Sequence, residues 1–316
     1  PSLDDFFNQT NNIDGYNGPT VFDRPIGAYE PNYVAGYIQD KFAFKDLVFN
    51  IGLRVDRFDA NQKVLKDPYL LFPAITAGEV RSGEDRSGLS IDVPDNIAND
   101  YIVYVDDIQD PGDILGYRNN STWYNSAGTE IVDAEVLQTS SGVLPYLVDP
   151  DKTNASEINS NAFVDYEPQT TFMPRIAFSF PISDEALFFA HYDVLTRRPD
   201  GGVRFSPTDY LFMQSTSDPL INNPALKPQK TVDYEIGFQQ KLNSYSSLKI
   251  AAFYKEIKDE IQITRVLDAY PVSYRTWGNL DFGTIKGMSF VYDLRRMENI
   301  GPRASYHLPF AEVPCS

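Results

Sequence analysis

Two neighbouring segments of the chain alternate apolar and polar residues, and this period of two constrains the fold more than any other feature. Every second residue from Val232 to Phe238 is apolar, and the residues between them are polar or glycine. After a short polar turn, a similar pattern runs from Leu248 to Tyr254. Because successive side chains of a strand point to opposite faces, both segments predict a strand with one apolar face. Such strands suit either a half-buried soluble sheet or a barrel wall between lipid and water.

Six further segments predict strands, and the connections between all eight follow a rule. The predicted strands span residues 33–44, 47–58, 171–180, 186–195, 231–239, 248–255, 283–294 and 303–311. Their connections are in turn short, very long, short, long, short, long and short. If all short connections lie on one side of a membrane, the strands pass up and down without contradiction. The pattern predicts an all-β fold of about eight antiparallel strands in an up-and-down transmembrane β-barrel with long extracellular loops.

The segment 59–170 carries most of the charge. It holds 20 Asp or Glu and 6 Lys or Arg, a net charge of −14 out of −17 for the whole chain. A structureless loop of this length is unusual in a compact soluble domain, whereas outer-membrane barrels have long extracellular loops. We therefore expect a long acidic extracellular region with a small sheet or helices of its own. The acidity argues against a nucleic-acid partner, because phosphate binding requires clustered Lys and Arg.

Composition fits a barrel but does not distinguish it from a soluble β-protein. Aromatic residues make up 14% of the chain, which is expected of membrane-interface belts and also of an aromatic-rich β-sandwich. The single cysteine, Cys315, excludes an intramolecular disulfide. No apolar run reaches the length of about 18 residues that a spanning helix needs.

Three segments resemble a known family. They are YIQDKFAFKDLVFNIGLRVDRF at 37–58, NNPALKPQKTVDYEIGFQQKL at 222–242 and GNLDFGTIKGMSFVYDLRR at 278–296. In this order they resemble the Y-x-Q-D…G-L-R-x-D, N-P-x-L-K-P-E…Y-E-x-G and G-N-x-x-x-G-x-x-K-G segments of the TonB-dependent outer-membrane receptors, in the form found in Bacteroidetes. Gln229 stands where the family often has Glu.

The resemblance implies an outer-membrane receptor that binds a nutrient at its extracellular loops. Import would follow when the energised inner-membrane TonB complex pulls on a plug domain. The implied partners are outer-membrane lipid, the TonB complex and a small-molecule, glycan or peptide substrate. The protein would not be an enzyme, and the sequence holds no G-x-S-x-G, H-E-x-x-H or phosphate-loop motif.

The family's barrels have about 22 strands and a plug domain ahead of them. We therefore expect residues 1–316 to be a partial barrel, with the signal peptide, the TonB-contacting segment, the plug and the closing strands outside this chain. Residues 1–32, rich in Asn, Asp, Gly and Pro, predict a loop. Two alternatives stay open. One is a small outer-membrane barrel or adhesin whose eight strands close on themselves. The other is a secreted β-rich glycan-binding module or glycosidase, in which the apolar faces of 232–238 and 288–294 pack across two sheets.

Charged residues on the predicted strands are expected to face the barrel lumen. An Arg or Lys on the lipid face near the bilayer centre costs about 2–4 kcal/mol, so the alternation assigns the polar face to water. The residues are Arg54, Asp56, Arg175, His191 and Asp193. His191 and Asp193 share a face and could bind a metal, but a hydrated wall against the plug is the favoured interpretation.

Two further clusters lie in the acidic region. Tyr117, Arg118, Trp123 and Tyr124 combine rings and a guanidinium suited to a sugar or peptide contact, or they hold the loop to itself. Asp106, Asp107, Asp110 and Asp113 lie in a tight turn-rich segment whose carboxylates suit calcium, with a solvated acidic surface as the alternative. No other cofactor is expected. A net charge of −14 would repel an anionic ferric chelate, so the sequence favours a neutral glycan or a peptide as the substrate.

Overall fold

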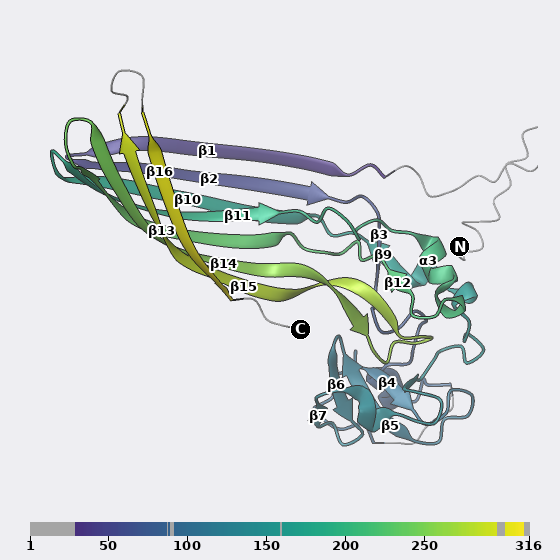
Figure 1. Ribbon diagram of the computed structural model, residues 1–316. Coiled ribbons are helices and arrows are strands. Elements are labelled where there is room, and N and C mark those ends of the chain that lie inside the picture. Colours follow the sequence, from purple (N-terminus) through teal and green to yellow (C-terminus); the bar gives the residue numbers. More distant parts are fainter. Residues whose placement is uncertain (1–28, 87, 89–91, 159, 296–300, 313–316) are drawn as a thin grey trace, which may run out of the picture.

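A single-layer antiparallel sheet dominates the computed structural model, which describes residues 29–86, 88, 92–158, 160–295 and 301–312 (Figure 1). In order across the sheet, the long strands are β1 (Asn32–Phe44), β2 (Leu47–Asp59), β10 (Gln169–Ser183), β11 (Ala186–Arg197), β13 (Gln229–Lys241), β14 (Ser246–Val266), β15 (Tyr274–Leu294) and β16 (Arg303–Glu312). All eight predicted strands are present, and each pairs with its sequence neighbour among them. No helix in the described part of the chain is long and apolar enough to cross a bilayer.

The sheet stays open at β1 and β16. Within the described residues, β1 pairs only with β2 and β16 only with β15. The small-barrel alternative requires the eight strands to close on themselves, and in the described residues they do not. The predicted loop at residues 1–32 falls almost entirely outside the described residues, as does Cys315.

The strand register separates an apolar face from a polar one. Phe238 lies directly opposite Ile250, which lies opposite Phe290, so β13, β14 and β15 present their apolar residues on the same side. This face is open: Ile236 is 57% exposed and Phe172 is 62% exposed. Because a surface this apolar needs an apolar covering, the face fits the bilayer. The secreted β-protein alternative is wrong on this point, since β13 and β15 lie in one sheet and do not face each other across two.

The connections sort to the two ends of the sheet as predicted. The turns at 45–46, 184–185 and 242–245 lie at the left-hand end in Figure 1, and the connections 60–168 and 198–228 lie at the other end. This arrangement places the two long connections on the same side of the membrane.

The long connection predicted between the strands 248–255 and 283–294, from about Lys258 to Leu280, is mostly strand. β14 and β15 continue their pairing through an irregularity near Glu260 as far as the pair Val266 and Tyr274. The prediction was wrong because the apolar alternation ends near Lys258. Beyond that point the hairpin extends past the apolar face, so lipid no longer imposes a period of two on its side chains.

Residues 60–168, hereafter the lobe, fold into a small unit of their own. One sheet contains β7 (Glu130–Ile131), β6 (Thr122–Asn125), β5 (Ile114–Asn119), β4 (Ile102–Val105) and β8 (Leu144–Pro145), and a second pairs β3 (Lys63–Leu65) with β9 (Phe163–Asp165). The helix α2 (Ala77–Ser82) begins with a capping box, in which the Thr76 side chain accepts from the Glu79 N–H and the Glu79 carboxylate accepts from the Thr76 N–H. Gly83 ends it in the left-handed conformation.

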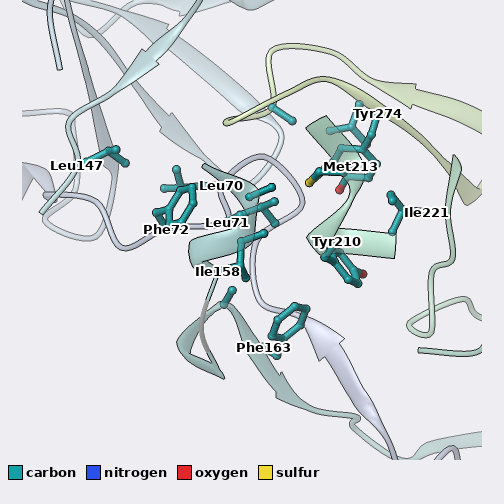
Figure 2. Close-up of a cluster of buried hydrophobic side chains, with 14 residues drawn as sticks. Leu70, Leu71, Phe72, Leu147, Ile158, Phe163, Tyr210, Met213, Ile221 and Tyr274 are labelled. Carbon is teal, nitrogen blue, oxygen red and sulfur yellow. The ribbon is translucent and has the colours of Figure 1, made fainter. Parts of the chain in front are cut away.

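A shared core joins the lobe to other segments at the same end of the sheet. Figure 2 shows Leu70, Leu71 and Phe72 of the lobe close to Tyr210 and Met213 of the connection 198–228 and to Tyr274 of β15. The Tyr274 hydroxyl donates to the Pro68 carbonyl at 2.7 Å, and the Tyr270 N–H donates to the Tyr69 carbonyl at 2.9 Å. Three segments far apart in sequence thus pack as one body. Its remaining elements are α3 (Pro207–Leu211), β12 (Leu220–Ile221) and the 3₁₀ turns Ala134–Leu137, Ala155–Glu157, Ser160–Ala162 and Met213–Ser215.

Candidate functional site

The polar face of the sheet carries the five residues predicted to face the lumen. Arg54 Nε lies 2.7 Å from Asp56 Oδ1, and Arg175 Nε lies 2.9 Å from Asp193 Oδ1. Arg175 and Asp193 are directly paired across β10 and β11, and Asp193 is paired with Asp233 of β13. Side chains of directly paired residues share a face, so these charges form a continuous polar wall opposite the apolar face. His191 lies on the same wall, directly opposite Glu235.

A groove of about 550 Å³ opens on this wall, toward the end that carries the lobe. Arg54 and Asp56 line it, together with Tyr33, whose hydroxyl donates to Asp56 Oδ2 at 2.6 Å. Arg198 lies over the Tyr33 ring at 4.3 Å and over the Phe58 ring at 5.0 Å, which are favourable cation–π distances. The groove therefore combines aromatic surface with donors and acceptors held in fixed positions.

Sequence reasoning missed Tyr33 and Arg198. The available signal for Arg198 was its place in the RRPDGG run directly after a predicted strand. Its neighbour Arg197 instead forms an ion pair with Asp200. Only the packing of Arg198 on the rings of Tyr33 and Phe58 shows which of the two arginines enters the groove.

One glycine in each of the three family segments makes room for a side chain directly opposite. Gln39 pairs with Gly52, Phe189 with Gly237 and Phe253 with Gly287. An added Cβ at Gly237 would lie 2.1 Å from the Phe189 ring, and one at Gly287 would lie 2.8 Å from the Phe253 ring. Each ring thus lies over the backbone of the neighbouring strand, a known means of pinning register.

Polar groups of the segments 222–242 and 278–296 form a joint between the two segments. The Lys227 N–H donates to Asn279 Oδ1 at 2.8 Å, and Asn279 Nδ2 donates back to the Lys227 carbonyl at 2.9 Å. Asn223 Nδ2 donates to the Trp277 carbonyl at 2.9 Å. The segment at 222–228 is therefore fastened to the start of β15.

Arg118 lies at the centre of the lobe and is 1% exposed. Its Nη2 lies 2.5 Å from Asp67 Oδ2, and its Nε donates to the Tyr104 hydroxyl at 2.8 Å. The guanidinium also lies 5.5 Å from the Trp123 ring centroid. Burial alone would lower the pKa of Arg118, but Tyr104 and Asp67 outweigh it and raise that pKa above its ordinary value. Burial has the opposite effect on Tyr104 and raises the pKa of its phenol to about 12. A neutral phenol therefore lies beside a charged guanidinium.

Burial removes three of the four predicted substrate contacts from the surface. Tyr117 is 0% exposed, Arg118 is 1% exposed and Trp123 is 5% exposed. The structure fits the alternative that these residues hold the lobe together. Tyr124 alone stays half-exposed, with its ring 5.2 Å from that of Tyr101. The sequence left both a ligand contact and a packing role open for these residues, because their burial depends on the surrounding strands.

The four aspartates proposed for calcium form a tight turn. Asp106 Oδ1 accepts from the N–H groups of Gly112 and Asp113, both at 2.9 Å. The Asp113 backbone N–H is the largest cause of a lowered Asp106 pKa; burial opposes it, and the Gly112 N–H adds to the lowering. Asp107 Oδ1 accepts from the Asp110 N–H at 3.1 Å. In the described ranges no group of three or more His, Cys, Asp or Glu is arranged to hold a metal ion, and calcium here stays a prediction.

The whole chain matches a family on sequence. The family model described as "TonB dependent receptor-like, beta-barrel" matches residues 2–308. The chain therefore belongs to the TonB-dependent receptor β-barrel family, whose members are transporters of the Gram-negative outer membrane and not enzymes. This confirms the fold class, the location and the non-enzymatic function predicted from sequence. The Bacteroidetes form stays a prediction.

Solved structures with a similar fold include outer-membrane transporters. The FrpB iron transporter from Neisseria meningitidis shares 12% identity at a TM-score of 0.41, over 90% of this chain and 27% of that one. The copper transporter OprC shares 12% sequence identity at a TM-score of 0.41, over 96% of this chain and 33% of that one. The hemophore receptor HasR of Serratia marcescens was solved with its hemophore HasA and heme. It shares 12% sequence identity at a TM-score of 0.41, over 90% of this chain and 34% of that one. The chain thus spans about a third or less of these proteins. No curated protein matches the sequence.

Proposed function

We propose that this chain is the ligand-gathering section of a receptor that imports a nutrient in a TonB-dependent manner. The observation that carries the proposal is the folded lobe at one end of the wall, joined to the other extracellular segments by a shared core. A ligand captured at the lobe would lie beside the groove that Tyr33, Arg54 and Arg198 line. Contact with TonB would be made by a part of the protein outside this chain.

A neutral glycan or a peptide is the substrate class that we propose. Residues 59–170, which include the lobe, carry a net charge of −14, which opposes an anionic ferric chelate at long range. In the groove, Arg54 is already paired with Asp56, so its donors are oriented while much of its charge is balanced. Fixed donors, fixed acceptors and the exposed Tyr33 ring suit the hydroxyl groups of a sugar or the amides of a peptide.

The proposal is tested by uptake in cells that produce the complete receptor, with and without a functional TonB. Labelled neutral oligosaccharides and short peptides are the first probes, and ferric siderophores are the comparison. TonB-dependent uptake of either of the first two is expected. Uptake that persists without TonB would overturn the transport proposal, whereas growth on ferric siderophores under iron limitation would overturn the substrate class alone.

A pair of adjacent arginines provides a matched control for the groove. Arg198→Gln removes the guanidinium over Tyr33, whereas Arg197→Gln removes one that pairs with Asp200 at the surface. We expect the first variant to weaken ligand binding about tenfold, as for the loss of one charge-assisted contact, and the second to leave binding unchanged. If both variants weakened ligand binding equally, the groove would not be part of the binding site.

A further inference from the structure

One of the three arginines that line the groove has no acidic partner. The three are Arg54, Arg175 and Arg198. Arg54 is paired with Asp56. Arg175 is paired with Asp193. No carboxylate of the described residues lies within the 4.0 Å of an ion pair from the Arg198 guanidinium. Because arginine stays protonated in proteins, three arginines against two aspartates leave the groove with an excess of one positive charge.

The contacts that hold Arg198 leave its hydrogen-bond donors free. Its guanidinium carbon lies 4.3 Å from the ring centroid of Tyr33 and 5.0 Å from that of Phe58. These rings attract the guanidinium as a cation and supply no oxygen acceptor for its N–H groups. Among the described residues the Arg198 side chain has no hydrogen-bond acceptor. Its forked donors are therefore available to an acceptor with two oxygens, which a carboxylate provides.

The segment directly after Arg198 is held by contacts outside the groove. Gln62 Nε2 donates to the Val203 carbonyl at 2.6 Å, and Gln62 Oε1 accepts from the Phe205 N–H at 3.0 Å. Gly202 has a φ of +70°, in the left-handed region that favours glycine. The guanidinium thus extends from a fixed turn, so a ligand that binds it loses little affinity to the ordering of that turn.

The charges around the groove favour a ligand with two opposite ends. Residues 59–170 carry a net charge of −14, which repels an anionic ligand at long range and attracts an ammonium group. Arg198 favours a negative group at short range. A peptide with free termini meets both requirements, because at neutral pH it carries an ammonium at one end and a carboxylate at the other. A neutral glycan offers nothing to the unpaired guanidinium, and an acidic glycan lacks the ammonium.

We propose that Arg198 binds the C-terminal carboxylate of a short peptide, whose N-terminal ammonium lies toward the acidic lobe. The inference rests on the proposed import function and narrows its substrate class to peptides. The groove volume of about 550 Å³ suits a short peptide, since small-ligand sites span about 300–1,000 Å³. Gln39 and Thr171 also line the groove and offer an amide and a hydroxyl to the peptide backbone.

Retention of peptides by the complete receptor in detergent tests this. The probe is a mixed pool of tetrapeptides, in which each sequence is present in equal amounts with a free C-terminal carboxyl and with a C-terminal amide. Mass spectrometry of the retained peptides gives the ratio of acid to amide. We expect the unchanged protein to enrich the acids about tenfold, as for one charge-assisted pair. A ratio between two ligands of one sample does not depend on how much of the receptor is folded.

Three variants assign the preference to one side chain. Arg198→Gln should retain acids and amides equally. Arg198→Lys keeps the charge but loses the forked donors, so it should enrich acids only about threefold. Arg197→Gln is the matched control, because Arg197 is paired with Asp200, and it should enrich acids as the unchanged protein does.

The outcomes separate this inference from the transport proposal. Equal retention of acids and amides by the unchanged protein, or an acid preference that survives Arg198→Gln, would overturn the inference. Failure to retain any peptide, together with TonB-dependent uptake of neutral oligosaccharides, would overturn it and leave the transport proposal standing. Peptide uptake that persists without TonB would overturn the transport proposal alone, since the acid preference is measured without TonB.

Discussion

The whole eight-stranded sheet, with both its faces, forms the wall of the barrel, and this wall and the lobe place their apolar side chains in opposite environments, although one chain forms both. On the wall, Ile236 and Phe172 are mostly exposed, and no second layer formed by the described residues covers them. In the lobe, Leu137 and Tyr146 are 0% exposed within an ordinary protein core. The wall depends on lipid for the burial that the lobe achieves by itself. Substitutions should therefore act by different rules in the two regions.

The largest expected effect is in the lobe. Arg118→Met should destabilise it by about 3–5 kcal/mol, because the change leaves Asp67 and Tyr104 without their buried cation. Limited proteolysis of the lobe on intact cells measures the effect, and the heat-resistant mobility of the barrel in detergent gels should not change. Lys63→Met is the control, because its ion pair with Asp165 is exposed and contributes at most about 1 kcal/mol. Equal protease sensitivity of both variants would contradict the central role of Arg118.

The next effect tests the two faces of the wall. Ile236→Arg places a charge on the apolar face and should destabilise the barrel by about 2–4 kcal/mol. Gln239→Arg places the same side chain on the polar face of the same strand and should be tolerated. The fraction of folded receptor in the outer membrane checks both. If the second variant were the more damaging, the assignment of the faces would be reversed.

A smaller effect is expected where a ring covers a glycine. Gly237→Ala puts a Cβ against the Phe189 ring and should cost about 1–3 kcal/mol through overpacking. Adding Phe189→Ala should recover part of that loss, because the two changes share one contact. Denaturant titration of the folded barrel measures this coupling. Gly36→Ala is the control, since an added Cβ there meets nothing within 4 Å. Strict additivity of the two changes would exclude the proposed contact.

The smallest effect concerns pH and the turn at Asp106. Backbone N–H groups lower the pKa of Asp106 in the folded lobe. A folded-state pKa below the unfolded value of about 3.9 stabilises the lobe above that pH, and the contribution is lost as the pH falls through the folded value. Asp106→Asn should therefore show a shallower loss of lobe stability below about pH 4 than the unchanged protein. Proteolysis across this pH range tests it, and identical curves would contradict it.

The sequence predicted the wall well because its strands obey a local rule. Each residue from Val232 to Phe238 meets either lipid or water, so the period of two can be read without knowing any partner strand. The rule failed beyond Lys258, where the β14–β15 hairpin leaves the apolar face and depends on contacts with the lobe. It also could not tell Arg198 from Arg197, because the rings of Tyr33 and Phe58 come from strands far away in sequence.

The sequence by itself thus determined the strands, their up-and-down order, the position of the acidic region and the family. The tertiary structure alone decided that Arg118 and Trp123 are buried, that three extracellular segments share one core, and that Arg198 lies over the Tyr33 ring. The physical reason is the range of the interactions. Alternation between lipid and water acts on each residue in turn, whereas burial in the lobe and charge pairing across strands require residues brought together from distant parts of the chain.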